Sequence, residues 1–287
     1  MLTAAQFAEQ QRALGRRIHA HDGVHWEEVY FGYCKPAFAF QAIAPGAARP
    51  ARGRSLLGYS HRVEDPAQAN RFVPAMLLAR DRLDGFGLPS LPQKKRNNVR
   101  RALEHCAVRP LDDLERHLER IRAINASQAE RHEKGVGAET PASRYVAEAE
   151  SWRAQMRREF ALAGREWWGA FAGDVLAAYL RTYQVEDVRI IEQAKTDTDC
   201  LKHYPMDALY FEVLSRAAAD ATCRLIVNGR PQHPSLNHFK EQFLFRPAEL
   251  PYYSSNARLV ECGKRVWLGF ARLRQVRRAP PPQREGP

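Results

Sequence analysis

Residues 187–193 read Asp-Val-Arg-Ile-Ile-Glu-Gln, residues 223–229 read Cys-Arg-Leu-Ile-Val-Asn-Gly, and residues 235–245 read Ser-Leu-Asn-His-Phe-Lys-Glu-Gln-Phe-Leu-Phe. The first two segments have the composition of buried strands, and the third has the apolar spacing of a helix. Pro205 opens a further helix between the two strands, and a hairpin that turns at Gly173-Asp174 precedes them. This part of the chain therefore predicts the succession β-β-β-α-β-α.

That succession resembles the core of the GNAT superfamily of acyl-group transferases. The ending Phe239-Lys-x-x-Phe-x-Phe and the upstream run Lys94-Lys-Arg-Asn-Asn-Val-Arg-Arg resemble the superfamily's Fem-like branch, which is related to peptidoglycan aminoacyltransferases. The resemblance implies an α/β (α+β) fold with a GNAT-like mixed sheet flanked by helices. Because Fem-like proteins carry two such domains, it also implies a tandem pair with a degenerate N-terminal copy.

The expected domain organisation follows from this resemblance and from shifts in composition. Residues 1–93 are expected to form a degenerate GNAT-like or accessory region, and residues 94–163 a helical connecting segment. Residues 164–278 would form the GNAT-like domain. Residues 279–287, Ala-Pro-Pro-Pro-Gln-Arg-Glu-Gly-Pro, have the composition of a disordered tail.

The bulk composition is that of a globular protein, with 45% hydrophobic and 27% charged residues in a chain of 287. No apolar run approaches the roughly 20 residues that span a bilayer, and the first residues lack the apolar core of a secretion signal. These features favour a cytoplasmic protein. The five cysteines show no paired short spacing, which argues against a disulfide framework and a cysteine-rich zinc site.

The net charge of +11 is unevenly distributed along the chain. Residues 94–109 and 258–278 are rich in lysine and arginine, with Glu104 and Glu261 as their single acids. Such patches attract RNA, phosphorylated cofactors or anionic lipid. A solvated, arginine-rich surface is an equally good interpretation.

The first half of the chain is expected to begin with an amphipathic helix over residues 3–20 and to continue with short strands near residues 29–33, 37–43 and 55–60. Asp65-Pro66 is a helix-start signal, and Phe72, Met76, Leu77 and Leu83 would form the apolar face of the helix that follows. Further helices are expected from Lys94, from Leu111 and over residues 142–162.

A GNAT-type site forms where two neighbouring parallel strands diverge at mid-sheet, here Val188–Ala194 and Cys223–Val227. The gap admits the acyl donor along a strand edge, and the acceptor amine approaches from the other side. Catalysis then depends on positioning, with a base for the incoming ammonium. Glu192 is the candidate base, because apolar neighbours Ile190 and Ile191 would raise the pKa of its carboxyl group. The alternative is an ion pair with a sheet neighbour such as Arg181.

The donor is expected to be a CoA thioester such as acetyl-CoA, or an aminoacyl-tRNA. Acetyltransferases hold the donor pyrophosphate on a glycine-rich loop at a helix N-terminus, but residues 195–206 contain no glycine. This departure favours the Fem-like branch, in which the donor can be an aminoacyl-tRNA. The candidate donor-binding residues are Ile191, Gln193, Lys195, Lys202, His203, Tyr204 and Asn228; a solvated loop is the alternative for Lys195, Lys202 and His203.

Lys240 stands where many acetyltransferases have a tyrosine that protonates the leaving thiolate. The resemblance implies that Lys240 contacts a phosphate or a carboxylate, and an exposed helix lysine is the alternative. Tyr252 and Tyr253 are alternative acids. The basic run supplies the candidate polyanion-binding residues Lys94, Lys95, Arg96, Arg100 and Arg101, which would contact phosphates rather than read bases.

The sequence thus predicts an N-acyltransferase that moves an acyl or aminoacyl group to an amine. The alternatives are a non-catalytic polyanion- or RNA-binding protein on the same fold, and a conventional acetyl-CoA enzyme with a remodelled phosphate loop. No metal is expected, although His19, His21 and His25 are closely spaced. A cysteine nucleophile at Cys200 or Cys223 has no evident histidine partner apart from His203.

Overall fold

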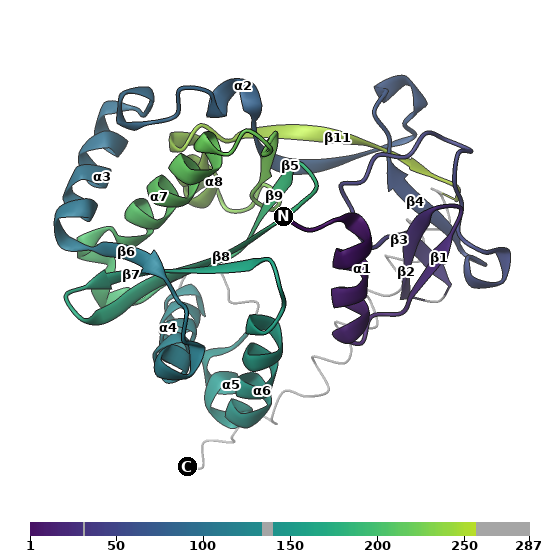
Figure 1. Ribbon diagram of the computed structural model, residues 1–287. Helices are drawn as coiled ribbons and strands as arrows, with labels where there is room; N and C mark the ends of the chain where they lie inside the picture. Colours follow the sequence, from purple (N-terminus) through teal and green to yellow (C-terminus); the bar gives the residue numbers. More distant parts are fainter. Residues whose placement is uncertain (31, 134–139, 257–287) are drawn as a thin grey trace, which may run out of the picture. The chain divides into compact units, whose positions relative to one another are not determined.

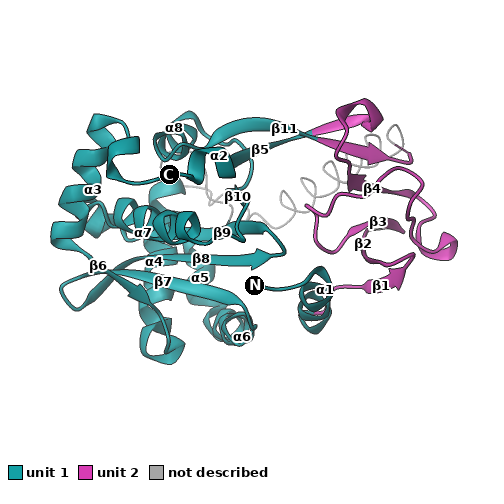
Figure 2. Ribbon diagram, turned by 45° about the horizontal axis from the view of Figure 1, so that its top comes forward, with its two compact units in different colours: residues 1–14, 73–250 teal, residues 15–72, 251–287 magenta. Residues whose placement is uncertain are grey.

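The computed structural model describes residues 1–30, 32–133 and 140–256. The described residues form two compact units, one within residues 1–14 and 73–250 and the other within residues 15–72 and 251–256 (Figure 2). The expected boundary near residue 93 is therefore not where the structure divides. The reason is that residues 77–79 pair with residues 225–227, so this strand belongs with the second half of the chain.

The first unit is built on a mixed sheet with the strand order β5-β10-β9-β8-β7-β6. Three long strands, β7 (Arg165–Ala172), β8 (Val175–Val185) and β9 (Val188–Thr196), form an antiparallel meander. The short strand β10 (Leu225–Val227) lies parallel to β9 and antiparallel to β5 (Arg71–Ala79), and β6 (Ala107–Pro110) closes the other edge.

Helices cover both faces of this sheet (Figure 1). On one face α3 (Gln93–His105), α7 (Pro205–Ala219) and α8 (Pro234–Gln242) pack over Leu180 and Ile191. On the other face α4 (Leu114–Glu133) and α6 (Ala149–Phe160) pack over Trp167 and Tyr179, and α5 (Ala142–Ala147) lies against α4. Trp167 and Trp168 are buried on opposite faces, as the alternation of side chains along a strand requires.

The second unit contains the strands β1 (Ile18–His21), β2 (Val24–Tyr30), β3 (Tyr33–Pro36) and β4 (Gly58–Arg62), and β4 pairs with residues 252–254 of β11 (Arg246–Ser254). Its small core surrounds Trp26, which is fully buried and packs edge-on against Tyr59. The described residues of this unit contribute none of the residues of the pocket described below.

The order of elements in the second half of the chain agrees with the sequence prediction, whereas several elements of the first half differ. The expected helix after Asp65 is a 3-10 turn, Pro66–Gln68, followed by β5, because Pro74 in the middle of the segment removes a donor that a helix requires. The N-terminal helix α1 spans only Ala4–Ala13, and β6 and β11 were not expected.

Two sequence predictions, the basic run 258–278 and the tail 279–287, fall on residues 257–287, which lie outside the described part of the chain. None of the described helices has both the length and the apolar composition that a membrane crossing requires.

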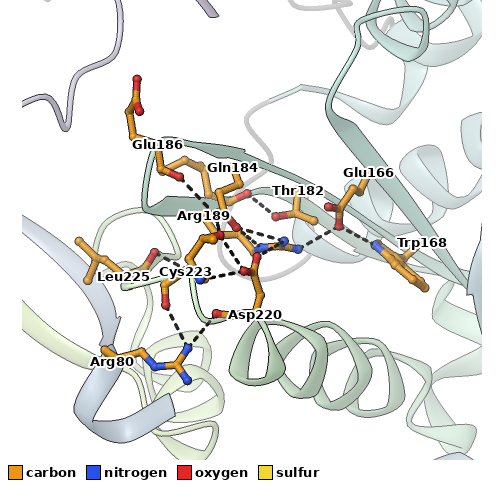
Figure 3. A network of polar contacts seen from close by, with 12 residues as sticks. Arg80, Glu166, Trp168, Thr182, Gln184, Glu186, Arg189, Asp220, Cys223 and Leu225 are labelled. Carbon is orange, nitrogen blue, oxygen red and sulfur yellow. Dashed lines mark hydrogen bonds and ion pairs between the residues drawn. The ribbon is translucent and has the colours of Figure 1, made fainter. Parts of the chain in front are cut away.

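Arg189 is a buried arginine at the start of β9 that links this strand to β8, to β7 and to the end of α7 (Figure 3). Arg189 donates to the side chains of Gln184 and Glu166 at 3.2 and 2.9 Å, and Asp220 at the end of α7 lies 3.9 Å away. Arg80 donates to the carbonyl oxygens of Ala218, Asp220 and Cys223. The N–H groups of Arg224 and Leu225 both donate to Asp187 O, so β9 and β10 are held together where they begin and can diverge only further along.

Candidate active site

The parallel strands β9 and β10 are paired over only three positions. Val188, Arg189 and Ile190 of β9 face Leu225, Ile226 and Val227 of β10. Beyond this point β9 continues to Thr196, whereas the chain after Val227 stays with β5 through Asn228 N–H donating to Met76 O and Met76 N–H donating to Gly229 O. The two strands therefore separate after Ile190.

A β-bulge lies on β9 at the point of separation. Arg181 of β8 pairs with Gln193 and Thr182 pairs with Ile191, so Glu192 is the extra residue of β9. A bulge changes the direction in which a side chain points and is common beside active sites. Here it places the carboxylate of Glu192 at the opening between the strands.

A pocket of about 800 Å³ occupies this opening. Its volume is within the range of small-molecule sites in proteins. The lining residues come from helices on both faces of the sheet, α4 on one and α7 and α8 on the other, so the pocket reaches both faces through the gap. They include Asn125, Gln128, His132, Tyr145, Arg181, Ile191, Glu192, Gln193, Lys195, Tyr210, Asn228, Leu236 and Lys240.

Glu192 is held by two arginines rather than surrounded by apolar groups. Its Oε2 atom forms ion pairs with Arg165 and with Nε of Arg181, the latter at 2.9 Å, and Arg181 also pairs with Glu159. The side chain is 29% exposed, and no described residue hydrogen-bonds to Oε1. The expected apolar environment is therefore wrong, and the sequence alternative, a pair with Arg181, is correct. One carboxylate oxygen remains available to a ligand.

Lys240 is buried, with only 3% of its surface exposed. Its Nζ atom donates to the carbonyl oxygens of Asn228 at 2.7 Å and of Arg230 at 3.4 Å, and among the described residues no carboxylate lies within ion-pair distance. Burial lowers the pKa of this ammonium group to about 8. Because an ammonium group has three hydrogens, one donor remains for a ligand in the pocket. The interpretation as an exposed helix lysine is wrong.

The structure brings together only part of the predicted donor-binding set. Ile191, Gln193, Lys195 and Asn228 line the pocket with Glu192 and Lys240. Lys202, His203 and Tyr204 lie outside it, at the 3-10 helix Thr198–His203 and the residue after it.

That 3-10 helix lies against the basic helix α3. The guanidinium of Arg101 is 5.4 Å from the centre of the Tyr204 ring, and the rings of His105 and His203 are 5.5 Å apart. Arg101 and Lys202 are both exposed. One surface, formed by Arg101, His105, Lys202 and His203, thus combines residues from the predicted donor loop and the predicted polyanion helix. We refer to it as the α3 basic surface.

The N-terminus of α7 does not fit the pyrophosphate of coenzyme A. Pro205 at the first helical position has no N–H, and the N–H groups of Asp207 and Ala208 both donate to Tyr204 O. The carboxylate of Asp207 is itself buried at this helix end and pairs with Lys95 at 2.7 Å. A carboxylate there disfavours a second anion, and few backbone donors remain for one.

The ion pair between Lys95 and Asp207 removes Lys95 from the predicted polyanion-binding set. Lys95 is 2% exposed, and its ammonium lies over the rings of Phe239 and Phe243, so a polyanion has no access to it. Arg96 is half-buried and donates to Leu91 O at 3.4 Å. Lys94, Arg100 and Arg101 are exposed.

Several residues that shape the pocket were not predicted from the sequence. Tyr210 lines it from α7, Arg165 fixes Glu192, and Asn125 and Gln128 line it from α4. Asn125 and Gln128 are polar residues on the otherwise apolar face of α4. This interruption of the apolar pattern is visible in the sequence. The described residues contain no cluster of three or more histidine, cysteine or acidic side chains suited to a metal ion, His19, His21 and His25 included.

Comparison with known proteins identifies the fold. No protein-family model and no curated protein matches the sequence. Among solved structures, FemX is 10% identical and superposes with a TM-score of 0.58 over 90% of this chain and 92% of its own.

Two further structures give a similar result. The C-terminal domain of a putative lysylphosphatidylglycerol synthetase from Agrobacterium fabrum is 10% identical, with a TM-score of 0.53 over 88% of this chain and 92% of its own. L-PGS from Bacillus licheniformis is 10% identical, with a TM-score of 0.52 over 89% and 93%. The chain therefore shares its fold with FemX and with these two structures, in agreement with the Fem-like fold that the sequence resemblance implied.

Proposed function

We propose that the protein transfers an acyl or aminoacyl group to an amine in the pocket between β9 and β10. The observation that carries the proposal is the pocket itself. It opens where β9 and β10 separate, and Glu192 of β9 and Lys240 of α8 both line it. Oε1 of Glu192 and one N–H of Lys240 are not used in hydrogen bonds with the described residues. Fold alone does not define a reaction, so the proposal depends on these side chains.

In this proposal the acceptor amine binds on the α4 side of the sheet. Its ammonium group donates to Oε1 of Glu192, whose other oxygen is fixed by Arg165 and Arg181. A carboxylate fixed in this way orients the amine and accepts its proton directly or through water.

The acyl group lies on the α7 and α8 side, where the ammonium of Lys240 stabilises negative charge that develops as the donor bond breaks. The donor is an acyl ester or thioester. The closed N-terminus of α7 favours an aminoacyl-tRNA over a CoA thioester, and the phosphates of such a donor would meet the α3 basic surface.

Substituting Leu236 by tryptophan provides a direct test of the pocket. Leu236 lines the pocket from α8 and is 39% exposed, so the larger ring obstructs the α8 side of the pocket at small cost to folding. A ligand at 100 times its Kd stabilises the wild type by about 2.7 kcal/mol, a rise in Tm of roughly 5–10 °C. We expect acetyl-CoA, a longer acyl-CoA or aminoacyl-tRNA to give such a rise, and Leu236→Trp to abolish it. Leu103→Trp, at a leucine of α3 that is 42% exposed, is the matched control.

Glu192→Gln tests the acceptor side. Loss of a charge-assisted hydrogen bond of about 1.5–3 kcal/mol should lower kcat/KM for the amine by roughly 10- to 100-fold and leave the donor KM unchanged. Glu159→Gln is the control, because Glu159 pairs with Arg181 but does not line the pocket. An unchanged kcat/KM for the amine in Glu192→Gln, measured on folded protein, would remove Glu192 from the acceptor site.

A second candidate function is polyanion binding without catalysis. The specific observation in its favour is the α3 basic surface, which lies outside the pocket and is joined on the same helix by exposed Lys94 and Arg100. It predicts RNA binding that weakens steeply with salt, survives Leu236→Trp, and is accompanied by no acyl transfer from any donor.

A further inference from the structure

Tyr210 is a buried titratable residue in the pocket for which the mechanism above has no role. It stands on α7, is 2% exposed and lines the pocket on the side of Lys240. Its ring packs edge-on against Phe239 at 5.0 Å and against Phe243 at 5.4 Å, which fixes its orientation.

The hydroxyl group of Tyr210 has an unused hydrogen. It accepts a hydrogen bond from Nδ2 of Asn228 at 3.0 Å, and within the described ranges no acceptor for its own hydrogen is found. The backbone oxygen of the same Asn228 accepts from Lys240 at 2.7 Å. The phenol of Tyr210 and the ammonium group of Lys240 are thus both hydrogen-bonded to Asn228, which follows β10 beside the gap into which the acyl donor would extend.

We infer that Tyr210 is the acid of this site and that its hydroxyl protonates the atom that leaves the acyl group. The inference rests on the proposed function. The amine nitrogen forms a bond to the acyl carbon, and the bond from that carbon to the donor's oxygen or sulfur breaks. The departing atom takes the electron pair of that bond and the proton of Tyr210. The acceptor ammonium loses one proton to Glu192 before it attacks, and the second proton, released by its nitrogen once the bond to the acyl carbon has formed, restores the phenol.

The chemistry of the phenol favours one class of leaving group. Burial raises the pKa of Tyr210 to about 12, so the group is fully protonated at neutral pH. A thiolate leaves readily without a proton, whereas an alkoxide is far more basic and needs one. An acid of this strength therefore suits an oxygen ester, such as the ester that joins an aminoacyl group to a ribose hydroxyl.

The test compares Tyr210→Phe with Tyr179→Phe. Tyr179 is a matched control, because it is fully buried and its hydroxyl accepts from Nδ2 of Asn125 at 2.8 Å, but it does not line the pocket. Both variants should lose a similar small amount of stability. Donors that carry one acyl group on an aryl thiol, an alkyl thiol and an alcohol are compared for kcat and KM.

We expect Tyr210→Phe to lower kcat for the alcohol ester by roughly 10²- to 10⁴-fold at unchanged KM, with a loss of less than about tenfold for the aryl thioester. Tyr179→Phe should leave all three donors unaffected. An equal loss with all three donors, or no loss, in an active protein overturns the inference alone. Absence of transfer by the wild type overturns the proposed function and the inference together.

Discussion

Replacement of Lys240 by methionine is expected to lower the rate of acyl transfer at pH 7 by roughly 10²- to 10³-fold, the usual cost of removing one preorganised donor to developing negative charge. Methionine has nearly the same length and shape, so the pocket keeps its form. The loss should appear in kcat, because the charge to be stabilised arises during the reaction rather than on binding. Steady-state kinetics with the donor found in the binding screen provides the measurement.

The pH dependence of activity separates two roles for this residue. Its pKa is lowered to about 8 by burial, so the group is an ammonium at neutral pH and loses its charge above that value. If the ammonium is required, activity falls as pH rises through about 8. If the neutral amine acts as a base, activity rises over the same interval. We expect a fall, and a rise would contradict the role proposed for Lys240.

The stability of the folded protein responds to pH in the opposite direction. Between about pH 8 and the ordinary lysine value of 10.5, the unfolded chain binds a proton at Lys240 and the folded protein does not. The free energy of unfolding therefore rises with pH across this window, because the unfavourable burial of a charge is relieved. Lys240→Met should lack this contribution, and Lys94→Met, at an exposed lysine, should retain it.

Lys240 also illustrates what sequence patterns can and cannot supply. Its place in Phe239-Lys-x-x-Phe-x-Phe marks it as a site residue by resemblance, and the structure places it in the pocket. The sequence does not indicate that it is buried without a carboxylate partner. That property depends on Asn228 and Arg230, whose carbonyl oxygens meet Lys240 only after β10 and α8 are assembled.

The elements of the first unit differ in how well the sequence predicted them, for physical reasons. Residues 167–172 and 175–183 are predominantly apolar and flank a Gly-Asp turn, a pattern that predicts two strands of a hairpin. Both segments are strands in the structure. The segment 71–79 has helical spacing at Phe72 and Met76. It forms a strand because it contains Pro74 and because its residues 77–79 pair with β10. Tertiary pairing overrode a local pattern.

The environment of Glu192 was mispredicted because its neighbours in sequence are not its neighbours in space. Ile190 and Ile191 suggest an apolar site, but the bulge turns Glu192 toward Arg165 and Arg181 on two other strands. A one-residue bulge in a ladder is invisible in the alternation of a single strand. The location of Glu192 at the site was predictable, whereas its partners were not.

The largest effect on stability is expected from Lys95→Met. Lys95 and Asp207 form a buried ion pair at 2.7 Å between α3 and α7, and removal of the lysine leaves the carboxylate of Asp207 buried without a cation. Breaking one partner of such a pair costs about 3–5 kcal/mol. Lys94→Met, at the exposed neighbour, should change the free energy of unfolding by less than about 0.5 kcal/mol. Urea denaturation of the two variants at pH 7 makes the comparison.

Two further measurements show whether the loss comes from an uncompensated charge. The double variant Lys95→Met/Asp207→Asn removes both charges, so it should recover most of the lost stability. Burial already raises the pKa of Asp207, and loss of Lys95, which lowers it, raises it further. A carboxyl group with a raised pKa in the folded state takes up a proton there first, so the deficit of Lys95→Met should shrink as pH falls from 7 toward 4. If Lys95→Met instead costs less than about 1 kcal/mol at pH 7, Lys95 is accessible to solvent and returns to the set of polyanion-binding candidates.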